Sequence, residues 1–588
     1  MRTRPALLLL AALACSKGVR KDVTPPLASQ AAEAAAQQAA LTDPPALTHA
    51  ELIEHALSRV TFGARPEDRA RVEKLGVSAF LEEQLHPERI DDAALEKRLG
   101  ADYTVLQRDS GDMVRQLVVA RKMRQEEKKN AQAPAAEPVQ QGKMAQPAEP
   151  QAGPPQAAEA PERPPRERAS KDLRKQLGRA GRGPGFDYVA QLSAAKVLRA
   201  VSSERQLQEV MTDFWFNHFN VFAGKEVESA LLPEYEQKTL RPNALSTFPE
   251  LLEATAHSPA MLIYLDNWRS AAPDAPVPRR VRRMWQADPQ QQPKRATRGL
   301  NENYARELLE LHTLGVDGGY TQQDIIEVAR CFTGWTVEQP QKDPRFVFRP
   351  QLHDWGKKLV LGHEIAPGGG ESDADQVLKI LENHPATARF IARKLARRFV
   401  SDDPPEELVT RIAARYTQTH GDIRSMLRAI FESPEFWSRK AVRAKVRSPL
   451  ELVASAVRAL DGRVDDPLSL ARAVARIGEP LYAAQPPTGY GDTAQAWLSS
   501  GALLARIDFG LQLANGQLQG VTVDLTKLQS ASGEQLVQRA AEQLGAPELS
   551  DKTREYVLAQ LKEAPPRPDT QARRAVGLLL GAPELQRR

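Results

Sequence analysis

The chain has 588 residues, of which 41% are hydrophobic, 26% charged and 6% aromatic. This composition supplies a sizeable core and excludes a wholly disordered chain, while two cysteines exclude a disulfide scaffold and a cysteine-rich zinc module. Eighty basic residues against 75 acidic ones leave a net charge of only +5, so we expect no nucleic acid among its partners.

The first 15 residues are predicted to be an export signal. Arg2 and Arg4 form a short basic region, and the apolar run 6–15 that follows is too short to span a bilayer. The segment 12–15, Ala-Leu-Ala-Cys, is similar to the lipobox of bacterial lipoproteins, although its leucine lies one position later than usual. We therefore expect Cys15 to carry lipid and to anchor the protein in a membrane, and Ser16 favours the outer membrane over a periplasmic position. The alternative is an ordinary secretory signal and a secreted protein.

The rest of the chain divides by composition. Residues 16–47, rich in Ala, Gln and Pro, are predicted to be a flexible tether, 48–520 a helical domain and 521–588 a C-terminal helical extension. The stretch 131–168 contains nine prolines and ten alanines with almost no branched or aromatic residues. Because it cannot bury enough apolar surface to offset the entropy of ordering, we expect a disordered insertion there.

Helical spacing dominates everything else, which predicts an all-α fold: a single large multi-helix body with at most one small β-hairpin. Capping boxes at 247–250 and 321–324 predict two helix starts, and Gly315 predicts a helix end. The segments 346–348 and 359–361, rich in Phe, Val and Leu, are predicted to pair with each other as the only hairpin.

A first group of polar residues lies in an aromatic helical segment, 211–219. At 100° per residue, Asp213, Asn217 and Asn220 share one stripe of that helix, while His218 points toward the aromatic side. His218 is either a hydrogen-bonded core residue or part of a site, and the spacing leaves both interpretations open.

A second group lies in the predicted helix 302–314. Asn303, Arg306, Glu307 and Glu310 fall within about a third of its circumference. One interpretation is a structural network in which Arg306 neutralises the acids, so that Glu307→Ala would leave Arg306 buried and unpaired. The other is a site for a polar ligand or a hard cation, since carboxylate and amide oxygens suit Ca²⁺ or Mg²⁺.

Two histidines, His257 and His353, are predicted at helix ends or in loops, where functional residues are common. Cys331 lies in an apolar helical stretch and is interpreted as a small core residue rather than a catalytic thiol. The chain has no His-Glu-x-x-His, Gly-x-Ser-x-Gly or phosphate-binding Gly-x-x-x-x-Gly-Lys-Ser/Thr motif, which disfavours common zinc proteases, esterases and nucleotide-driven enzymes.

Several of these segments together resemble the bacterial exported-protein family catalogued as a domain of unknown function, number eighteen hundred in its series. The resemblance covers roughly 50 to 520, and its strongest part is the run 301–315, Asn-Glu-Asn-Tyr-Ala-Arg-Glu-Leu-Leu-Glu-Leu-His-Thr-Leu-Gly. It is also carried by the segments 55–63, 211–219, 257–267, 329–335, 353–354 and 433–436. The long insertion and Tyr490, where similar chains tend to carry Gly-Trp, depart from the pattern. The resemblance implies an exported, mostly helical protein without an assigned activity, commonly encoded beside an exported sulfatase-like protein that is therefore a candidate partner.

Two hypotheses about function follow. The first is a hydrolase or related enzyme acting on an envelope or extracellular polymer. Its pocket would contain His218, His257 and His353, with Glu307 or Glu310 as general base or as ligand of a divalent cation, and Asn217, Asn303 and Arg306 holding the substrate. The second is a non-catalytic cell-surface scaffold in which the same residues form buried networks.

Overall fold

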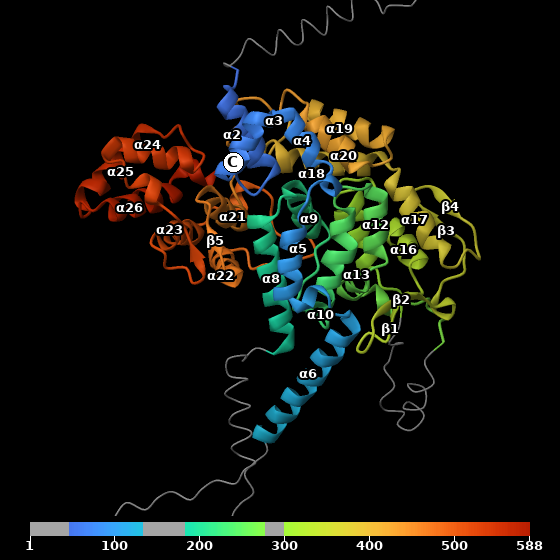
Figure 1. Cartoon of the computed structure of the whole chain (residues 1–588). Helices are drawn as coiled ribbons and strands as arrows, with labels where there is room; N and C mark the ends of the chain where they lie inside the picture. The colour runs from blue at the N-terminus through green and yellow to red at the C-terminus, as the bar shows by residue number, and fades with distance from the viewer. Residues whose placement is uncertain (1–45, 133–182, 277–298) are drawn as a thin grey trace, which may run out of the picture. The chain divides into compact units, whose positions relative to one another are not determined.

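The computed structural model describes residues 46–132, 183–276 and 299–588 (Figure 1). Residues 47–588 form one compact unit, and most of its buried apolar side chains belong to one core. The predicted signal peptide with Cys15, nearly all of the predicted tether and all but the first two residues of the predicted insertion 131–168 lie outside the described residues. The all-α prediction is confirmed, since helices account for most of the described elements.

The helices before the first gap are short, apart from the last. They are α2 (His49–Val60), α3 (Pro66–Leu75), α4 (Val77–Gln84), α5 (Ala93–Asp102) and α6 (Ser110–Gln132). Helix α2 begins at a capping box in which the Thr48 side chain accepts from the Glu51 backbone and the Glu51 side chain accepts from that of Thr48. This fixes the start of a helix that lines one of the cavities described below.

The central segment carries the two polar groups singled out in the sequence. Its α-helices are α8 (Pro184–Ser202), α9 (Gln206–His218), α10 (Glu228–Glu234), α11 (Arg241–Asn243), α12 (Phe248–Ala256), α13 (Pro259–Tyr264), α15 (Asn303–Glu307) and α16 (Gln322–Cys331). The capping boxes at Thr247 and Thr321 and the positive φ of Gly315, 82°, are confirmed. The predicted helix 302–314 differs in one respect: after Glu307 it continues as a π-helical turn, η6 (Leu308–Thr313). A second π-helical turn, η3 (Tyr235–Leu240), follows α10.

The predicted hairpin is wrong in its pairing and in being the only one. Strand β1 (Trp335–Glu338) pairs with β2 (Arg345–Phe348), β3 (Lys358–Val360) with β4 (His363–Ile365), and β5 (Arg463–Val464) with β6 (Val521–Thr522), all antiparallel. Phe348 therefore faces Trp335 across β1 and β2 instead of a residue of 359–361. Two nearby partners were available to each short apolar segment, and the sequence did not decide between them.

Ten further α-helices follow among the described residues. They are α17 (Ser372–Glu382), α18 (Pro385–Phe399), α19 (Glu406–Gln418), α20 (Ile423–Phe431), α21 (Pro449–Ala459), α22 (Pro467–Ile477), α23 (Ser500–Ala514), α24 (Gly533–Gln543), α25 (Asp551–Glu563) and α26 (Pro568–Leu580). Helix α26 packs extensively against α23, as Figure 1 shows in red and orange. The segment 521–588, predicted to be an extension, thus contacts the preceding helices directly.

Helix α8 lies in the middle of the compact unit, with α21, α22 and α10 packed against it (Figure 1). Arg458 of α21 ties this centre to the first helices: its guanidinium donates to the carbonyls of Gly63 at 2.5 Å and Val201 at 2.7 Å, and to the Asp68 carboxylate at 2.7 Å. One fully buried side chain therefore joins segments from three distant parts of the sequence.

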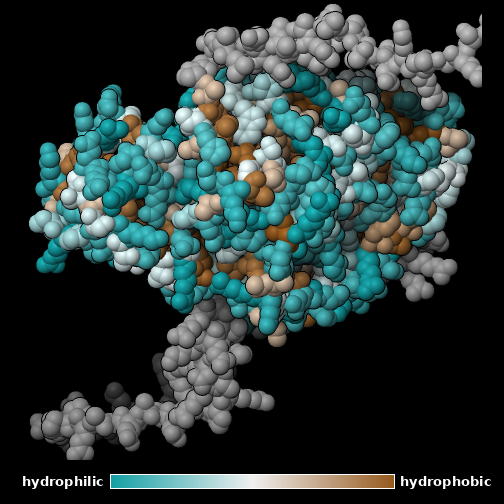
Figure 2. Space-filling view, turned by 45° about the horizontal axis from the view of Figure 1, so that its top comes forward, coloured by the Kyte–Doolittle hydropathy of each residue, from teal (hydrophilic) through white to brown (hydrophobic). Residues whose placement is uncertain are grey.

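The face in Figure 2 is mostly hydrophilic, with small separate apolar patches between the charged side chains. Among the described helices, none has the length and apolar character that crossing a membrane requires.

Candidate functional site

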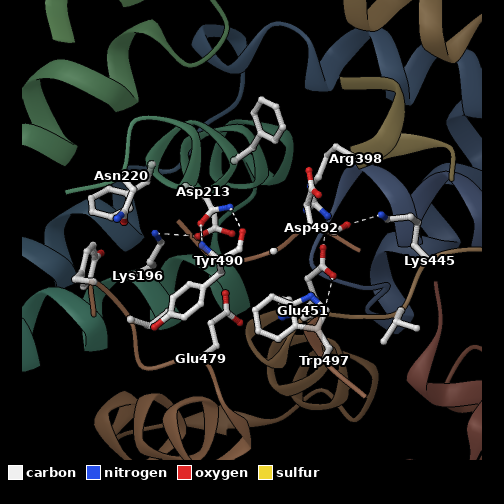
Figure 3. Close-up of a pocket in the computed structure, with 18 of the residues that line it drawn as sticks. Lys196, Asp213, Asn220, Arg398, Lys445, Glu451, Glu479, Tyr490, Asp492 and Trp497 are labelled. Carbon is white, nitrogen blue, oxygen red and sulfur yellow. Dashed lines mark hydrogen bonds and ion pairs between the residues drawn. The ribbon is translucent and has the colours of Figure 1, made fainter. Parts of the chain in front are cut away.

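A small polar cavity lies where α8, α9, the start of α21 and the loop 479–497 meet (Figure 3). It encloses about 90 Å³. That is room for roughly three water molecules at about 30 Å³ each. Its walls carry both acidic and basic side chains, namely Lys196, Asp213, Arg398, Lys445, Glu451, Glu479, Asp492 and Arg588. Such a concentration of ionisable groups around one hollow is the usual mark of a binding or catalytic site.

One wall is the polar stripe of α9. Asp213 and Asn217 line the cavity from one face of α9, and Asn220, which lies beyond the end of that helix at His218, lines it as well. Figure 3 shows Asp213 at the centre of the view, with Lys196 beside it. The predicted common face is therefore confirmed for Asp213 and Asn217 but not for Asn220.

Asp213 is held by a lysine on the neighbouring helix. Lys196 Nζ lies 2.9 Å from Asp213 Oδ1 and 3.5 Å from Glu236 Oε2, and it sits over the rings of Phe216 and Tyr482 at 4.8 and 5.0 Å. Burial alone would lower the pKa of Lys196, but the charges of Asp213 and Glu236 raise it. The Lys196 ammonium therefore keeps its charge beside Asp213.

Glu479 has the opposite environment. It is buried, and its Oε2 accepts a hydrogen bond of 2.8 Å from the backbone amide of Leu450. Burial and the neighbouring charge of Asp213 raise the pKa of Glu479 to about 8, so its carboxyl group is protonated at neutral pH. Glu479 and the ion-paired Asp213 thus line one cavity in different environments, an arrangement that separates acid and base roles in active sites.

The far side of the cavity is an ion-pair network. Glu451 Oε1 lies 3.1 Å from Arg588 Nη2, Glu451 also pairs with Arg398, and its Oε2 accepts from the Ser448 backbone amide at 2.9 Å. Lys445 pairs with Asp402 and donates to the carbonyl of Asp492 at 2.7 Å. These groups are largely satisfied by one another and give the cavity a rigid polar wall.

The mouth of the cavity is shaped by aromatic residues and by a clamp on the loop. Asn217 Nδ2 donates to the Tyr490 carbonyl at 2.8 Å, and the Tyr490 amide donates to Asn217 Oδ1 at 2.7 Å. Gly489 has φ +69°, and a Cβ there would lie 2.4 Å from Asn217 Oδ1, so only glycine fits. Tyr490, Gly491 and Trp497 also line a wider adjoining hollow of about 580 Å³.

The remaining predicted site residues do not line this cavity. His218 is buried among aromatic rings, and its Nε2 lies 3.1 Å from the carbonyl oxygen of His312 in η6. Burial lowers the pKa of His218 well below its usual value, so the ring is neutral. The two polar segments of the sequence therefore do meet, but through a histidine in the core.

His257 and His353 contact the β1–β2 hairpin. His257 caps α12, its Nδ1 lies 3.0 Å from the Glu253 carbonyl oxygen, and its ring packs 4.4 Å from that of Trp335. His353 is fully enclosed: Nδ1 lies 2.7 Å from the Thr333 carbonyl oxygen, and Nε2 lies 3.1 Å from Asp373 Oδ2. His353 is thus part of a closed internal network.

Lys358 completes the network around His353. Its Nζ pairs with Asp373 and lies 3.4 Å from His353 Nε2, and the side chains of all three residues are 0% exposed. A histidine, a lysine and an aspartate sealed from water serve the fold directly, since their charges balance one another.

The polar face at 303–310 lies near the surface. Arg306 is 40% exposed and pairs with Glu302 at 3.3 Å instead of neutralising Glu307. Asn303 Nδ2 donates to the Leu265 carbonyl at 3.3 Å, and Glu310 Oε2 accepts from the Tyr320 hydroxyl at 3.4 Å. Glu310 lies within the π-helical turn η6, and its charge acts on Glu307 and on Tyr320.

Glu307 is half-buried, and burial followed by the charge of Glu310 raises its pKa. Across the described ranges, no three or more histidine, cysteine, aspartate or glutamate side chains are grouped as metal ligands. Cys331 is 0% exposed, and burial raises the pKa of its thiol to about 12, as a core cysteine requires.

Sequence reasoning missed Lys196, Glu451 and Glu479. Lys196 stands within an apolar run of α8, which is a usable signal because a buried lysine needs a partner. Glu451 follows Ser448 at the spacing of a capping box, which it forms, so nothing in the sequence marks its second role. Glu479 has no local signal, because its environment comes from α9 and α21.

Comparison with known proteins places the chain in a family. Searches of curated proteins and of solved structures found no match. The family model described as "Protein of unknown function (DUF1800)" matches residues 55–587, which includes the cavity of Figure 3 and the segment 521–587. The chain therefore belongs to the DUF1800 family.

Proposed function

We propose that the protein is an exported, lipid-anchored hydrolase of an envelope or extracellular polymer, and that the cavity of Figure 3 is its active site. The observation that carries this proposal is the pair of carboxyl groups with opposed environments. Asp213 is ion-paired with Lys196, whereas Glu479 is buried and protonated. Paired carboxyl groups of this kind act as general base and general acid in many hydrolases.

In the proposed mechanism, one carboxyl oxygen of each group takes part in proton transfer. The Leu450 amide holds Glu479 Oε2, which leaves Oε1 to carry the proton that the leaving oxygen of the substrate takes up. Asp213 Oδ2, the oxygen that does not pair with Lys196 at 2.9 Å, accepts a proton from water as that water attacks. Glu479 ends the step as a carboxylate and Asp213 as a carboxylic acid. Asp213 then releases its proton to solvent and Glu479 takes one up, which restores both groups.

The neighbouring hollow supports a polymeric substrate. It adjoins the cavity through Tyr490, Gly491 and Trp497, so a chain lying in the hollow can place one unit at the carboxyl groups. Aromatic rings beside a pair of carboxyl groups are typical of sites that cleave bonds between sugars. We therefore propose a glycan as the polymer.

The proposal is tested by incubating the purified protein with peptidoglycan and with soluble polysaccharides and measuring new reducing ends. We expect Glu479→Gln and Asp213→Asn each to lower the rate by about 100-fold or more. Glu382→Gln is the matched control, since burial also raises the pKa of Glu382 but it lies on α17, outside the cavity. Unchanged activity in Glu479→Gln would refute the assignment. Loss of activity in Glu307→Gln or Glu310→Gln alone would move the site to the face predicted from the sequence.

The lipid anchor is proposed from the segment 12–15, and the sulfatase-like partner from the family resemblance. Growth with radiolabelled palmitate should label the wild type and leave Cys15→Ser unlabelled, and fractionation should move that variant from the outer membrane to the soluble fraction. Labelling of Cys15→Ser at the wild-type level would refute the anchor.

The alternative is a non-catalytic surface scaffold. The closed network of His353, Lys358 and Asp373 favours it, because side chains in such networks fix the fold without touching a substrate. In that case no polymer yields reducing ends, and Glu479→Gln changes only the stability of the protein.

A further inference from the structure

A second cavity of about 340 Å³ lies between α2, the segment 439–447, the loop 544–548 and residues 587–588. It is larger than the cavity of Figure 3, and Arg588 lines both. Its volume corresponds to roughly eleven waters at about 30 Å³ each, enough for a doubly charged anion or a short sugar segment.

The walls of this cavity have an excess of positive charge. Its lining contains six arginines and three glutamates. The arginines are Arg69, Arg439, Arg443, Arg447, Arg587 and Arg588, and the glutamates are Glu51, Glu54 and Glu548. Six positive charges against three negative ones leave an excess of three at one hollow.

Two of the glutamates are ion-paired with arginines. Glu54 pairs with Arg69, and Glu51 Oε2 accepts from Arg439 Nη2 at 2.9 Å. Arg588 is similarly paired with Glu451 outside this cavity. These pairs neutralise part of the wall and cannot account for the rest of the positive charge.

Three arginines of the lining have no carboxylate partner among the described residues: Arg443, Arg447 and Arg587 form no ion pair there. Arg443 donates only to the carbonyls of Glu548 at 3.3 Å and Gly545 at 3.4 Å, both long contacts, and its backbone has φ +52°. Arg447 donates to the carbonyl of Leu585. A guanidinium that meets only carbonyl oxygens keeps its full charge available for an anion.

Buried hydrogen-bond donors behind the wall also favour binding of an anion. Arg59 is 0% exposed and follows Ser58, which lines the cavity, and its Nε and Nη1 have no hydrogen-bond partner. Its Nη2 donates to the carbonyl of Ala441, next to the lining residue Val442. Arg588 Nη1 is likewise buried and unpartnered. Buried guanidinium donors without acceptors are costly, and a bound anion would offset part of that cost.

We infer that this arginine-lined cavity binds a multivalent oxyanion, carried as phosphate or carboxylate groups. Planar guanidinium groups match both kinds of oxyanion through pairs of parallel hydrogen bonds. Burial lowers the pKa of Arg59 to about 9 and that of Arg447 to about 10, and an anion beside them would reverse that effect. The inference is independent of the acid–base cavity, because Arg588 is the one residue that the two linings share.

The test is titration calorimetry on the full chain at low ionic strength. One arm uses inorganic pyrophosphate, a second uses the disaccharide of galacturonic acid, and neutral maltose is the control ligand. We expect one equivalent of at least one anion to bind and maltose not to bind. Tighter binding of pyrophosphate would identify phosphate as the natural group, and tighter binding of the uronic acid disaccharide would identify carboxylate.

Variants then locate the site. Arg443→Gln and Arg587→Gln should each weaken binding by about tenfold or more, since each removes a charge-assisted contact. Arg472→Gln makes the same charge change at an exposed position of α22 and should leave affinity unchanged. Glu479→Gln should also bind normally, which separates this inference from the proposed hydrolase. Absence of binding by both anions, or equal weakening in Arg472→Gln, would overturn it.

Discussion

Asn217 and Tyr490, 273 positions apart, are joined by two hydrogen bonds of 2.8 and 2.7 Å between one side-chain amide and one backbone unit. The contact fixes the loop 485–491 to α9 and closes one side of the acid–base cavity. Because the amide group both donates and accepts, neither aspartate nor leucine at position 217 can replace it.

Asn217→Ala should therefore loosen the loop. Loss of two hydrogen bonds, with the Tyr490 amide left unpaired, should lower the free energy of unfolding by about 2–3 kcal/mol. Hydrogen exchange of the Tyr490 amide should accelerate as well. Asn383→Ala is the control: Asn383 is exposed and donates only to nearby residues of α17, the Lys379 carbonyl and the Glu382 side chain, so its removal should cost well under about 1 kcal/mol. Equal effects of the two substitutions would contradict the role given to Asn217.

Two adjacent lysines, Lys357 and Lys358, form ion pairs that differ in burial. Lys358 pairs with Asp373 where both side chains are 0% exposed, whereas Lys357 pairs with Glu364 where they are 57% and 60% exposed. Lys358→Met should lower the free energy of unfolding by about 3–5 kcal/mol, because it leaves Asp373 buried without its partner. Lys357→Met should change it by less than about 1 kcal/mol. Urea unfolding of the two variants measures the difference, and similar midpoints would show that the buried network does not hold the fold.

Glu307 tests the network interpretation of the polar helix. Since Arg306 is 40% exposed and pairs with Glu302, Glu307→Ala leaves no buried, unpaired cation. We expect the free energy of unfolding to change by less than about 1 kcal/mol at neutral pH, as for a surface position. A loss of several kcal/mol in thermal melts would restore the network interpretation.

Glu479 should make stability depend on pH. Its pKa is raised from 4.5 to about 8 on folding, so the folded state binds the proton more tightly than the unfolded state. Stability should then decline as pH rises from about 4.5 through about 8, where the unfolded chain has already lost this proton. Glu479→Gln lacks that decline and should melt at the same temperature as the wild type near pH 4 but higher at pH 9. Parallel melting curves across this range would show that Glu479 is not buried as a neutral acid.

Much of the fold could be predicted because helix starts, ends and faces are encoded within a few residues. Thr247 and Thr321 cap helices where their spacing predicts, and Asp213 and Asn217 share a face because that needs only the helical period. Asn220 lies beyond the end of α9, which the spacing did not indicate. The turn η6 could not be predicted this way, since one extra residue in a turn depends on packing around His312 rather than on local spacing.

Which residues form the candidate site depends on contacts between segments that are far apart in the sequence. Glu479 becomes an acid with a raised pKa only when α9 and α21 enclose it, and Lys196 finds Asp213 across two helices. His353 looked like a loop residue but is sealed by Lys358 and Asp373, which lie five and 20 positions away. Residue types alone therefore indicated which side chains are unusual, but not which of them share a cavity.

The Arg458–Asp68 contact has a consequence for the order of events during biosynthesis. The two residues are 390 positions apart, and translation at about 5–20 residues per second separates their appearance by tens of seconds. Before Arg458 emerges, Asp68 is ion-paired only with Arg65 among the described residues, and the carbonyls of Gly63 and Val201 lack the Arg458 donor. The junction between the first helices, α8 and α21 is therefore completed only after most of the chain has been made.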